Sequence, residues 1–152
     1  GLQYLHARYY DPVLARFLTP DTLWARADSI AQRAFRAGLI KAGKLDPKLV
    51  QDAHHIVMKA GQYAAPARKI LDDFKIDINA IENGVGLSTH FKNRAHSERY
   101  AVAVNRRLRG LMSEDAVVGE LDKIGKELSS YDKEGKSLEN WAEDQMSNSA
   151  KP

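Results

Sequence analysis

Residues 52–57 read Asp-Ala-His-His-Ile-Val, and residues 82–87 read Glu-Asn-Gly-Val-Gly-Leu. The apolar run after the two histidines is β-prone, so we expect a strand that carries the pair and continues over residues 55–58. Asn-Gly is a turn signal, and the residues after it are predicted to form a second strand that pairs back on 55–58. Apolar residues at helical spacing over residues 64–74 predict a helix between the strands. The two stretches therefore predict a strand, a helix and a second strand.

The rest of the chain is predicted to be mostly helical. Apolar residues at helical spacing indicate helices over residues 23–41 and 97–112, and a further acidic helix from Ser113 onward. Tyrosines in an extended pattern before Asp11-Pro12 predict a strand followed by a turn, and Pro20-Asp21-Thr22 predicts a second break. The predicted fold class is α+β, mostly helical.

Length and composition limit the functions that the chain can have. A chain of 152 residues suffices for one ordinary domain with some peripheral segments, and none of its apolar runs is long enough to span a bilayer. It has no cysteine, which excludes disulfides, thiolate metal sites and cysteine nucleophiles. The start at Gly1 has no signal-peptide pattern, so we expect the chain to begin inside a longer protein.

Charge is unevenly distributed along the chain. The net charge of +3 divides into 0 for residues 1–23, +8 for residues 24–112 and −5 for residues 113–152. All histidines except His6 lie between positions 54 and 96, inside the basic part. Because histidine is the commonest side-chain metal ligand, this cluster indicates metal-assisted hydrolysis. A basic segment suits a polyanion such as nucleic acid, although a merely solvated basic surface explains the charge equally well.

A tyrosine-rich motif occupies the first 23 residues. It comprises Gly1-Leu2-x-Tyr4-x-x-Ala7-Arg8-Tyr9-Tyr10-Asp11-Pro12, Arg16-Phe17-Leu18 and Pro20-Asp21. This motif resembles the end of the conserved core of Rhs-type polymorphic toxins, in which a large β-rich shell precedes a variable toxin. The resemblance implies that Asp11 and Asp21 belong to the family's self-cleavage motif. The sequence continues Asp21-Thr22-Leu23-Trp24 where many members have Asp-Pro and then Gly-Leu, so we expect no cleavage here without the shell. Alternatively, both aspartates are only turn residues beside proline.

The histidine pair belongs to a longer pattern over about residues 52–111. It comprises Ala53-His54-His55-Ile56-Val57, Ala67-Arg68, Ile76-Asp77-Ile78-Asn79, Glu82-Asn83-Gly84-Val85, His90, and His96-Ser97 followed by Tyr100. In order and spacing this pattern resembles the AHH family of toxin nucleases within the HNH and endonuclease VII group. The resemblance implies a ββα-metal (His-Me finger) core, with a helix inserted between the two strands and with flanking helices.

Phosphodiester cleavage needs an activated water, a counter-charge for the phosphate oxygens and help for the leaving group, which one base and one divalent metal can supply. Adjacent residues on a regular strand point to opposite faces, so the two histidines are expected to have different roles. The resemblance implies that His55 is the general base and that His54 binds one magnesium, manganese or zinc ion together with His90 and His96. It also implies that Asn83 holds the hairpin and orients the His55 ring.

Alternatives stay open for several of these residues. Asp52 is a possible substitute ligand, His90 could be an exposed loop residue, and Asn83 could serve only the turn. Three arginines share a face of the helix expected over residues 97–112 and are candidates for binding the phosphate backbone, although arginines on a surface helix are usually only solvated. They are Arg99, Arg106 and Arg109.

These patterns divide the chain into the end of an Rhs core (1–23), an AHH-type nuclease domain with a leading helix (24–112) and an acidic helical extension (113–152). The expected function is a metal-dependent DNA endonuclease toxin used in interbacterial competition. We expect it to be secreted as part of an Rhs protein, as a type VI secretion effector, and to act in the cytoplasm of the target cell. The expected partners are DNA, the Rhs shell and a cognate immunity protein. The alternatives are an RNase on the same site, or a non-catalytic module that binds zinc or nucleic acid.

Overall fold

The computed structural model describes the backbone of residues 3–5, 8–11, 16–18, 20–88 and 97–148, and the side chains from residue 29 onward within these ranges. The chain forms two units, Gly1–Ala34 and Phe35–Pro152, with one helix, α1 (Pro20–Lys41), running from the first into the second.

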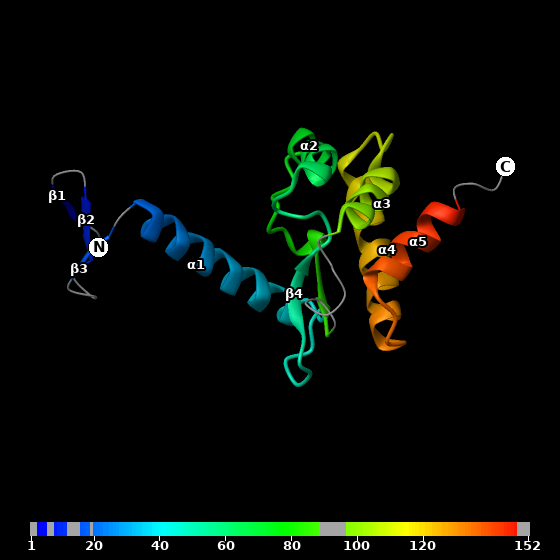
Figure 1. Ribbon diagram of the computed structural model, residues 1–152, viewed down its shortest axis with the longest axis horizontal. Helices are drawn as coiled ribbons and strands as arrows, with labels where there is room; N and C mark the ends of the chain where they lie inside the picture. Colours follow the sequence, from blue (N-terminus) through cyan, green and yellow to red (C-terminus); the bar gives the residue numbers. More distant parts are fainter. Residues whose placement is uncertain (1–2, 6–7, 12–15, 19, 89–96, 149–152) are drawn as a thin grey trace. The chain divides into compact units, whose positions relative to one another are not determined.

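The first unit contains a small antiparallel sheet. Its strands are β1 (Gln3–Leu5), β2 (Arg8–Asp11) and β3 (Arg16–Leu18), in the order β1-β2-β3 (Figure 1). The prediction of one strand was too simple, because β2 pairs on both of its edges, Tyr10 facing Gln3 in β1 and Phe17 in β3.

The break predicted at residues 20–22 was wrong, because α1 begins at Pro20. A proline is tolerated at the first position of a helix, where its missing N–H has no intrahelical partner. The backbone of Asp21 is therefore helical rather than part of a turn, while Asp11 ends β2.

The second unit is built around a two-stranded antiparallel hairpin. Its strand β4 (Asp52–His55) pairs with β5 (Gly84–Leu87), so that His54 faces Val85 and His55 faces Gly84. The two predicted strands are present, but the pairing is shifted, because β4 ends at His55 instead of continuing over residues 55–58. The backbone N–H of Ile56 then donates to the carbonyl of Asn83, 2.9 Å away, outside the regular ladder.

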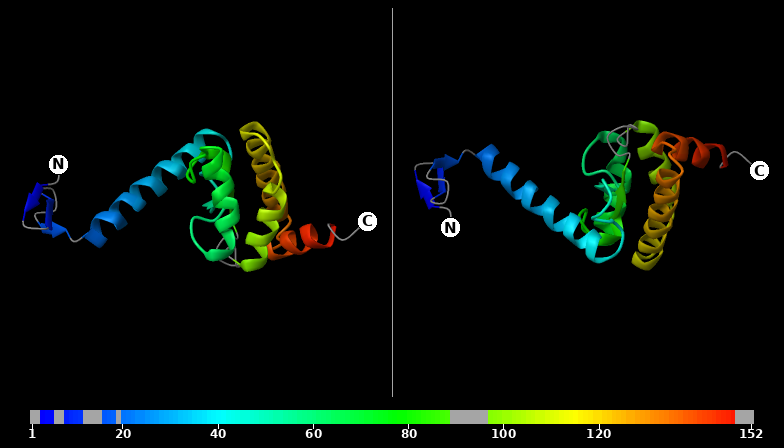
Figure 2. Two further views of the ribbon diagram at one scale, coloured as in Figure 1. Left: turned by 90° about the horizontal axis from the view of Figure 1, so that it is seen from above. Right: turned by 90° about the horizontal axis from the view of Figure 1, so that it is seen from below.

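Helical segments connect and cover the hairpin. Between its strands lie a short 3₁₀ turn (Gln62–Ala64), α2 (Ala65–Asp73) and a second 3₁₀ turn (Ile81–Asn83). After it come α3 (Glu98–Leu108), α4 (Glu114–Lys133) and α5 (Leu138–Asn148), which pack together beside the hairpin (Figures 1 and 2). The predicted inserted helix and the helix after the second strand are confirmed, whereas the single acidic helix expected after Ser113 is two helices.

The alternating faces of the hairpin meet two different cores. Val85 and Leu87 face the larger core, which α2, α3, α4 and α5 supply and which includes the fully buried Trp141. Ala53 faces a smaller cluster on the other side, which consists of Phe35, Leu39, Leu45 and Ala53. The glycines of β5 lie on this second face, where a Cβ atom on Gly86 would approach the Leu45 backbone to 2.8 Å. Both faces of the hairpin are therefore covered by protein.

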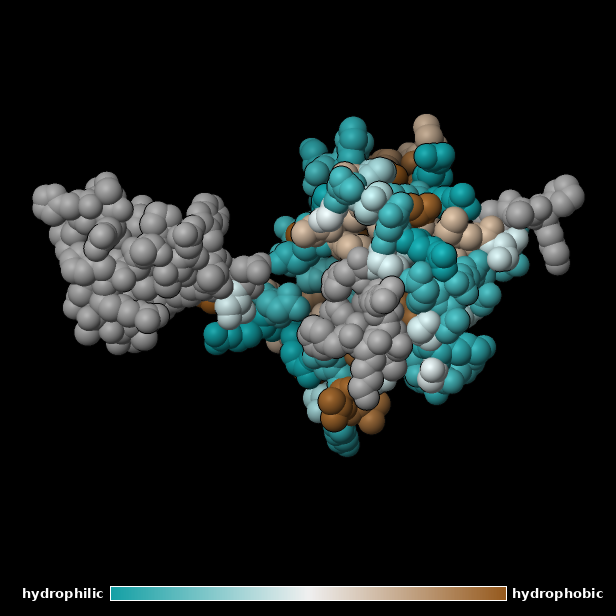
Figure 3. Space-filling model, viewed as in Figure 1, coloured by the Kyte–Doolittle hydropathy of each residue, from teal (hydrophilic) through white to brown (hydrophobic). Residues whose placement is uncertain are grey.

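The surface of the second unit is mostly hydrophilic on the face drawn in Figure 3. No helix among the described residues is long and apolar enough to cross a membrane. Large apolar side chains that stay exposed in the described part of this unit are Leu49, Val50, Tyr63 and Met112.

Candidate active site

The strand geometry sends the two histidine rings to opposite faces of the hairpin. His55 shares its face with Ala53 and lies against α1, whereas His54 points toward α3. His54 is fully buried and His55 is 8% exposed. Both histidines are therefore buried, His54 completely and His55 almost completely.

The His55 ring is held by two neighbours from different parts of the chain. Phe35, in α1, stacks on it with ring centroids 4.1 Å apart and planes 11° apart. Asn79 contacts its edge, with the side-chain Oδ1 3.0 Å from Nε2. Asn79 is itself placed by Asp77, whose carboxylate accepts a hydrogen bond from the Asn79 backbone N–H at 2.7 Å. Among the described residues, Phe35 therefore contacts the face of the ring and Asn79 its edge.

Asn83 links the end of β4 to the loop before β5. Its buried amide accepts a hydrogen bond from the Val57 N–H at 2.7 Å and donates to the carbonyls of Val57 and Ile78. These contacts hold the chain just after the histidine pair. Asn83 was expected to contact the His55 ring through a hydrogen bond, but Asn79 makes that contact instead, through its Oδ1.

His54 lies against Tyr100 of α3. Its Nε2 is 3.0 Å from the tyrosine hydroxyl oxygen, and the hydroxyl donates to the carbonyl of Ile56, also at 3.0 Å. The two rings meet edge to face with centroids 5.5 Å apart. Burial raises the pKa of the Tyr100 phenol, which therefore stays protonated near neutral pH. A buried chain of contacts thus connects His54, Tyr100 and the backbone that follows His55.

Residues 37–130 match the family model AHH, a nuclease family of the HNH/ENDO VII superfamily with conserved AHH. The chain belongs to the AHH nucleases. The matched segment contains the hairpin, both histidines and the Asn79, Asn83 and Tyr100 contacts. It identifies the protein as a phosphodiester hydrolase with a nucleic acid substrate. Comparison with curated proteins and with solved structures finds no match.

Nucleases of this superfamily generally use a divalent metal. Within the described residues no three His, Asp or Glu side chains lie close enough together to hold one. His54 has the chemistry of a ligand, because an imidazole that uses one nitrogen for a hydrogen bond can offer the other to a metal. The other predicted ligands, His90 and His96, lie outside the described residues. Asp52, the possible substitute, begins β4 and is partly buried.

The three arginines proposed for substrate binding have different surroundings in the structure. Arg99 forms ion pairs with Glu139 and Glu143 of α5, so acidic groups already surround its charge. Arg106 and Arg109 are exposed, and neither makes an ion pair with another described residue. Arg109 is the C-cap residue of α3, three positions after Arg106, and its backbone N–H still donates to the Asn105 carbonyl of the helix.

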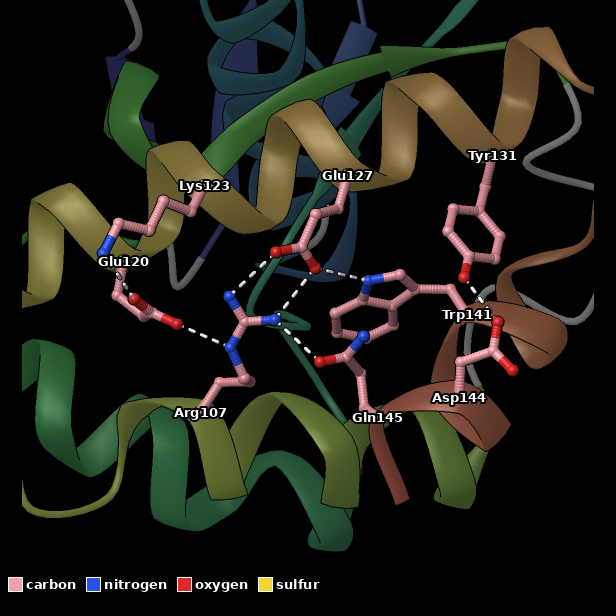
Figure 4. A network of polar contacts seen from close by, with 8 residues as sticks. All are labelled: Arg107, Glu120, Lys123, Glu127, Tyr131, Trp141, Asp144 and Gln145. Carbon is pink, nitrogen blue, oxygen red and sulfur yellow. Dashed lines mark hydrogen bonds and ion pairs between the residues drawn. The ribbon is translucent and has the colours of Figure 1, made fainter. Parts of the chain in front are cut away.

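Arg107 holds the three C-terminal helices of this AHH nuclease together. Its guanidinium bonds Glu120 and Glu127 of α4 and Gln145 of α5, and Glu127 also accepts the indole N–H of Trp141 (Figure 4). Partial burial disfavours the charge of Glu127, but hydrogen bonds from Arg107 and Trp141 outweigh it and lower the pKa of this carboxyl group. The acidic C-terminal segment therefore packs on the core of the protein.

Sequence reasoning assigned no role to three residues that contact the histidines. Asn79 and Tyr100 belong to the pattern that resembles the AHH family. The sequence therefore drew attention to both positions, but it did not indicate what either side chain contacts. Phe35 had no such signal, because it lies 20 residues before His55 in a helix whose side-chain spacing indicates only a buried face.

Proposed function

We propose that this AHH nuclease is a metal-dependent DNA endonuclease and the toxic part of an Rhs effector. The observation that carries the catalytic part is the division of the histidine pair. His55 lies against Phe35 and Asn79 and is 8% exposed, while His54 is fully buried against Tyr100. Two neighbouring imidazoles thus have environments suited to different tasks.

His55 acts as the general base and takes a proton from the attacking water. A base must be within hydrogen-bond reach of the proton that it removes, and its ring must be correctly rotated. The stacked Phe35 and the Asn79 amide supply that orientation. Asn83 supports the same site by holding the backbone after the pair.

His54, His90 and His96 would hold the divalent metal, which is magnesium, manganese or zinc. When bound, the ion supplies positive charge for the phosphate oxygens and the leaving group. The enclosed position of His54 excludes water from one side of this ligand. Its contact with Tyr100 keeps the ring from rotating.

The net charge of +8 over residues 24–112 supports a polyanionic nucleic acid substrate, which we propose to be DNA. Among the arginines of the α3 region, Arg106 and Arg109 are the better candidates for contacting phosphates, since both are exposed. Arg99 contributes less, because Glu139 and Glu143 offset its charge. Contacts to the phosphate backbone carry little sequence information, so we expect slight sequence preference.

The biological setting is proposed from the first 23 residues, which resemble the end of an Rhs core. In this setting the Rhs shell carries the nuclease through a specialised export system, and the nuclease acts in the cytoplasm of a competing cell. A cognate immunity protein protects the producer. An acidic immunity protein would complement the basic middle of the chain.

The test is a cleavage assay with plasmid DNA and, separately, structured RNA, in the presence of magnesium, manganese or zinc and with a chelator as control. We expect metal-dependent cleavage of DNA, loss of cleavage in His55→Ala, and unchanged cleavage in His6→Ala, a histidine substitution outside the matched segment. Cleavage of RNA with intact DNA would replace the DNA endonuclease by an RNase on the same site. Absence of cleavage of either polymer under all metals would overturn the proposal.

A further inference from the structure

Residues 56–63 connect the histidine pair to α2. Side chains of the candidate active site hold the start of this segment. Tyr100 donates to the Ile56 carbonyl at 3.0 Å, and Asn83 bonds both backbone groups of Val57. The segment is therefore attached to the active site where it begins.

The rest of the segment is attached to α2 and α3. The guanidinium of Arg68, in α2, donates to the carbonyls of Met58 and Gly61, at 3.2 and 2.9 Å. The amide of Asn105, in α3, donates to the Tyr63 carbonyl at 2.6 Å, and its oxygen accepts a backbone N–H of α2 at 3.1 Å. These contacts hold the backbone of Tyr63 beside α3.

The side chain of Tyr63 is exposed although its backbone is held. Its exposed fraction is 44%, and it is the only exposed aromatic residue among the described side chains. Aromatic rings carry a large apolar area and are usually enclosed, so an exposed ring on a held backbone offers apolar surface to a partner. A nucleobase is a flat partner of this kind, and proteins that bind single strands stack bases on such rings.

Two arginines lie close to Tyr63. Arg109 donates its backbone N–H to the Asn105 carbonyl at 3.0 Å, so it lies one turn after Asn105 on the side of α3 that holds Tyr63. Arg68 brings its guanidinium to the Gly61 carbonyl, two residues before Tyr63. Neither arginine forms an ion pair with a described carboxylate. The described part of the chain therefore does not offset the positive charge beside the ring.

We propose that Tyr63, Arg68 and Arg109 form a subsite for single-stranded nucleic acid, in which the tyrosine ring stacks on an unpaired base and the two guanidinium groups contact neighbouring phosphates. A base inside a duplex is covered by its neighbours, so only an unpaired base can present its face to the ring. This inference rests on the proposed function and narrows its substrate to a strand that is unpaired beside the active site. Stacking accepts every base, in agreement with the slight sequence preference expected.

The first measurement is the affinity of chelator-treated protein for labelled single strands of oligothymidine and oligouridine, by fluorescence anisotropy. Loss of a stacking ring typically lowers affinity about 5- to 150-fold, so we expect a decrease of that size in Tyr63→Ala. Tyr63→Trp, which keeps an aromatic ring, should bind as the wild type does. Met112→Ala is the matched control, because it removes an 88% exposed apolar side chain that has no ring. A decrease for one strand alone would support the subsite and identify its sugar, whereas wild-type affinity of Tyr63→Ala for both strands would overturn the inference.

Stacking on a base is tested separately from contact with phosphates. An abasic strand with the same number of phosphates, and a blunt duplex, should bind Tyr63→Ala as tightly as they bind the wild type. Photocrosslinking of a strand that contains 5-iododeoxyuridine, followed by peptide mass spectrometry, should attach the strand to Tyr63. Equal losses of affinity for all three ligands, or crosslinks to other residues alone, would contradict the stacking.

The phosphate contacts are tested by the salt dependence of single-strand affinity in Arg68→Gln and Arg109→Gln. Each phosphate contact contributes about 0.7 to the slope of log affinity against log salt, so each variant should lower the slope by about that amount. Arg99→Gln is the matched control, because Glu139 and Glu143 already pair with Arg99. Circular dichroism checks the folding of Arg68→Gln, since Arg68 also holds the segment. Unchanged slopes in folded Arg68→Gln and in Arg109→Gln would overturn the phosphate contacts.

These binding measurements need no cleavage and no metal, so they separate the subsite from the proposed function. If Tyr63→Ala loses single-strand affinity as expected but the wild type cleaves neither DNA nor RNA, the proposed function fails while the subsite remains. If the wild type cleaves DNA and Tyr63→Ala binds single strands equally well, the subsite fails while the proposed function remains.

Discussion

The side chains around the histidine pair come from three separate stretches of the chain. Phe35 precedes the pair in α1, Asn79 and Asn83 lie in the loop before β5, and Tyr100 lies in α3. Asn83 is the most constrained of them, because its buried amide makes hydrogen bonds with two backbone groups of Val57 and one of Ile78. At this scale the site depends on buried polar groups that make their hydrogen bonds within the protein.

Replacing Asn83 by alanine should destabilise the fold strongly. The substitution leaves the Val57 N–H and two carbonyls without their partner, and each buried unsatisfied group costs about 1–3 kcal/mol. Urea unfolding monitored by circular dichroism measures the loss. Asn148→Ala, at an exposed position at the end of α5, should change the free energy of unfolding by less than about 0.5 kcal/mol. Equal stabilities of the two variants would show that the Asn83 contacts contribute nothing.

The opposed directions of His54 and His55 could be predicted from the sequence, because strand geometry alone requires them. The partners of the two rings could not. Asn79 contacts His55, whereas the Asn83 amide is used by the backbone of Val57 and Ile78. Phe35 reaches the site only through the packing of α1 on the hairpin. Such contacts depend on tertiary structure, which periodicity and turn signals do not encode.

At the scale of elements, the hairpin is covered on both faces, and the glycines of β5 make this possible. Gly86 lies directly against the Lys44-Leu45 segment, and its N–H donates to the Lys44 carbonyl at 2.8 Å. The sequence predicted a turn at Asn83-Gly84 and a short strand after it. The strand is present, but it begins at Gly84 itself, the turn before it is the 3₁₀ turn Ile81–Asn83, and the register is shifted. Asn83 bonds the backbone beyond His55 and so ends the ladder there.

Gly86→Ala should destabilise the protein by about 1–3 kcal/mol, the usual cost of forcing an extra carbon into a packed core. The new Cβ would lie 2.8 Å from Cα of Leu45, and the backbone hydrogen bond between the two segments opposes their separation. Gly119→Ala is the matched control. It lies inside α4 with no atom within 4 Å of its added Cβ, so it should stabilise the helix by roughly 0.5–1 kcal/mol. Chemical denaturation of both variants measures the difference, and a stable Gly86→Ala protein would contradict the close packing described for β5.

At the scale of the whole molecule, the helices of the acidic C-terminal segment pack on the core of the second unit. Trp141 of α5 packs on Tyr100, which contacts His54, and the ion pairs of Arg107 join α3 to α4. The sequence predicted an acidic helical extension over residues 113–152, but its charge did not indicate whether the extension packs on the rest of the protein. The buried apolar residues of these helices show that both helices pack on the larger core.

The Arg107–Glu127 contact should make stability depend on pH in the acid range. Because hydrogen bonds from Arg107 and Trp141 lower the pKa of Glu127, its stabilising contribution is complete above the ordinary pKa of a glutamate and is lost as pH falls through the lowered value. Glu127→Gln should therefore be less stable than wild type at neutral pH, with the difference shrinking in acid. Urea unfolding over a series of pH values checks this. The exposed Glu82→Gln should keep the wild-type pH dependence, and a constant difference between Glu127→Gln and wild type at all pH values would contradict the assignment.

The most direct test of the central claim measures DNA cleavage and zinc binding side by side in His55→Ala and His54→Ala. We predict that His55→Ala binds zinc as the wild type does but cleaves plasmid DNA about 10²- to 10⁴-fold more slowly, the usual contribution of a general base. His54→Ala should lose zinc affinity and cleavage together. Wild-type cleavage by His55→Ala, or loss of zinc binding in that variant with retention in His54→Ala, would contradict the division of roles within the pair.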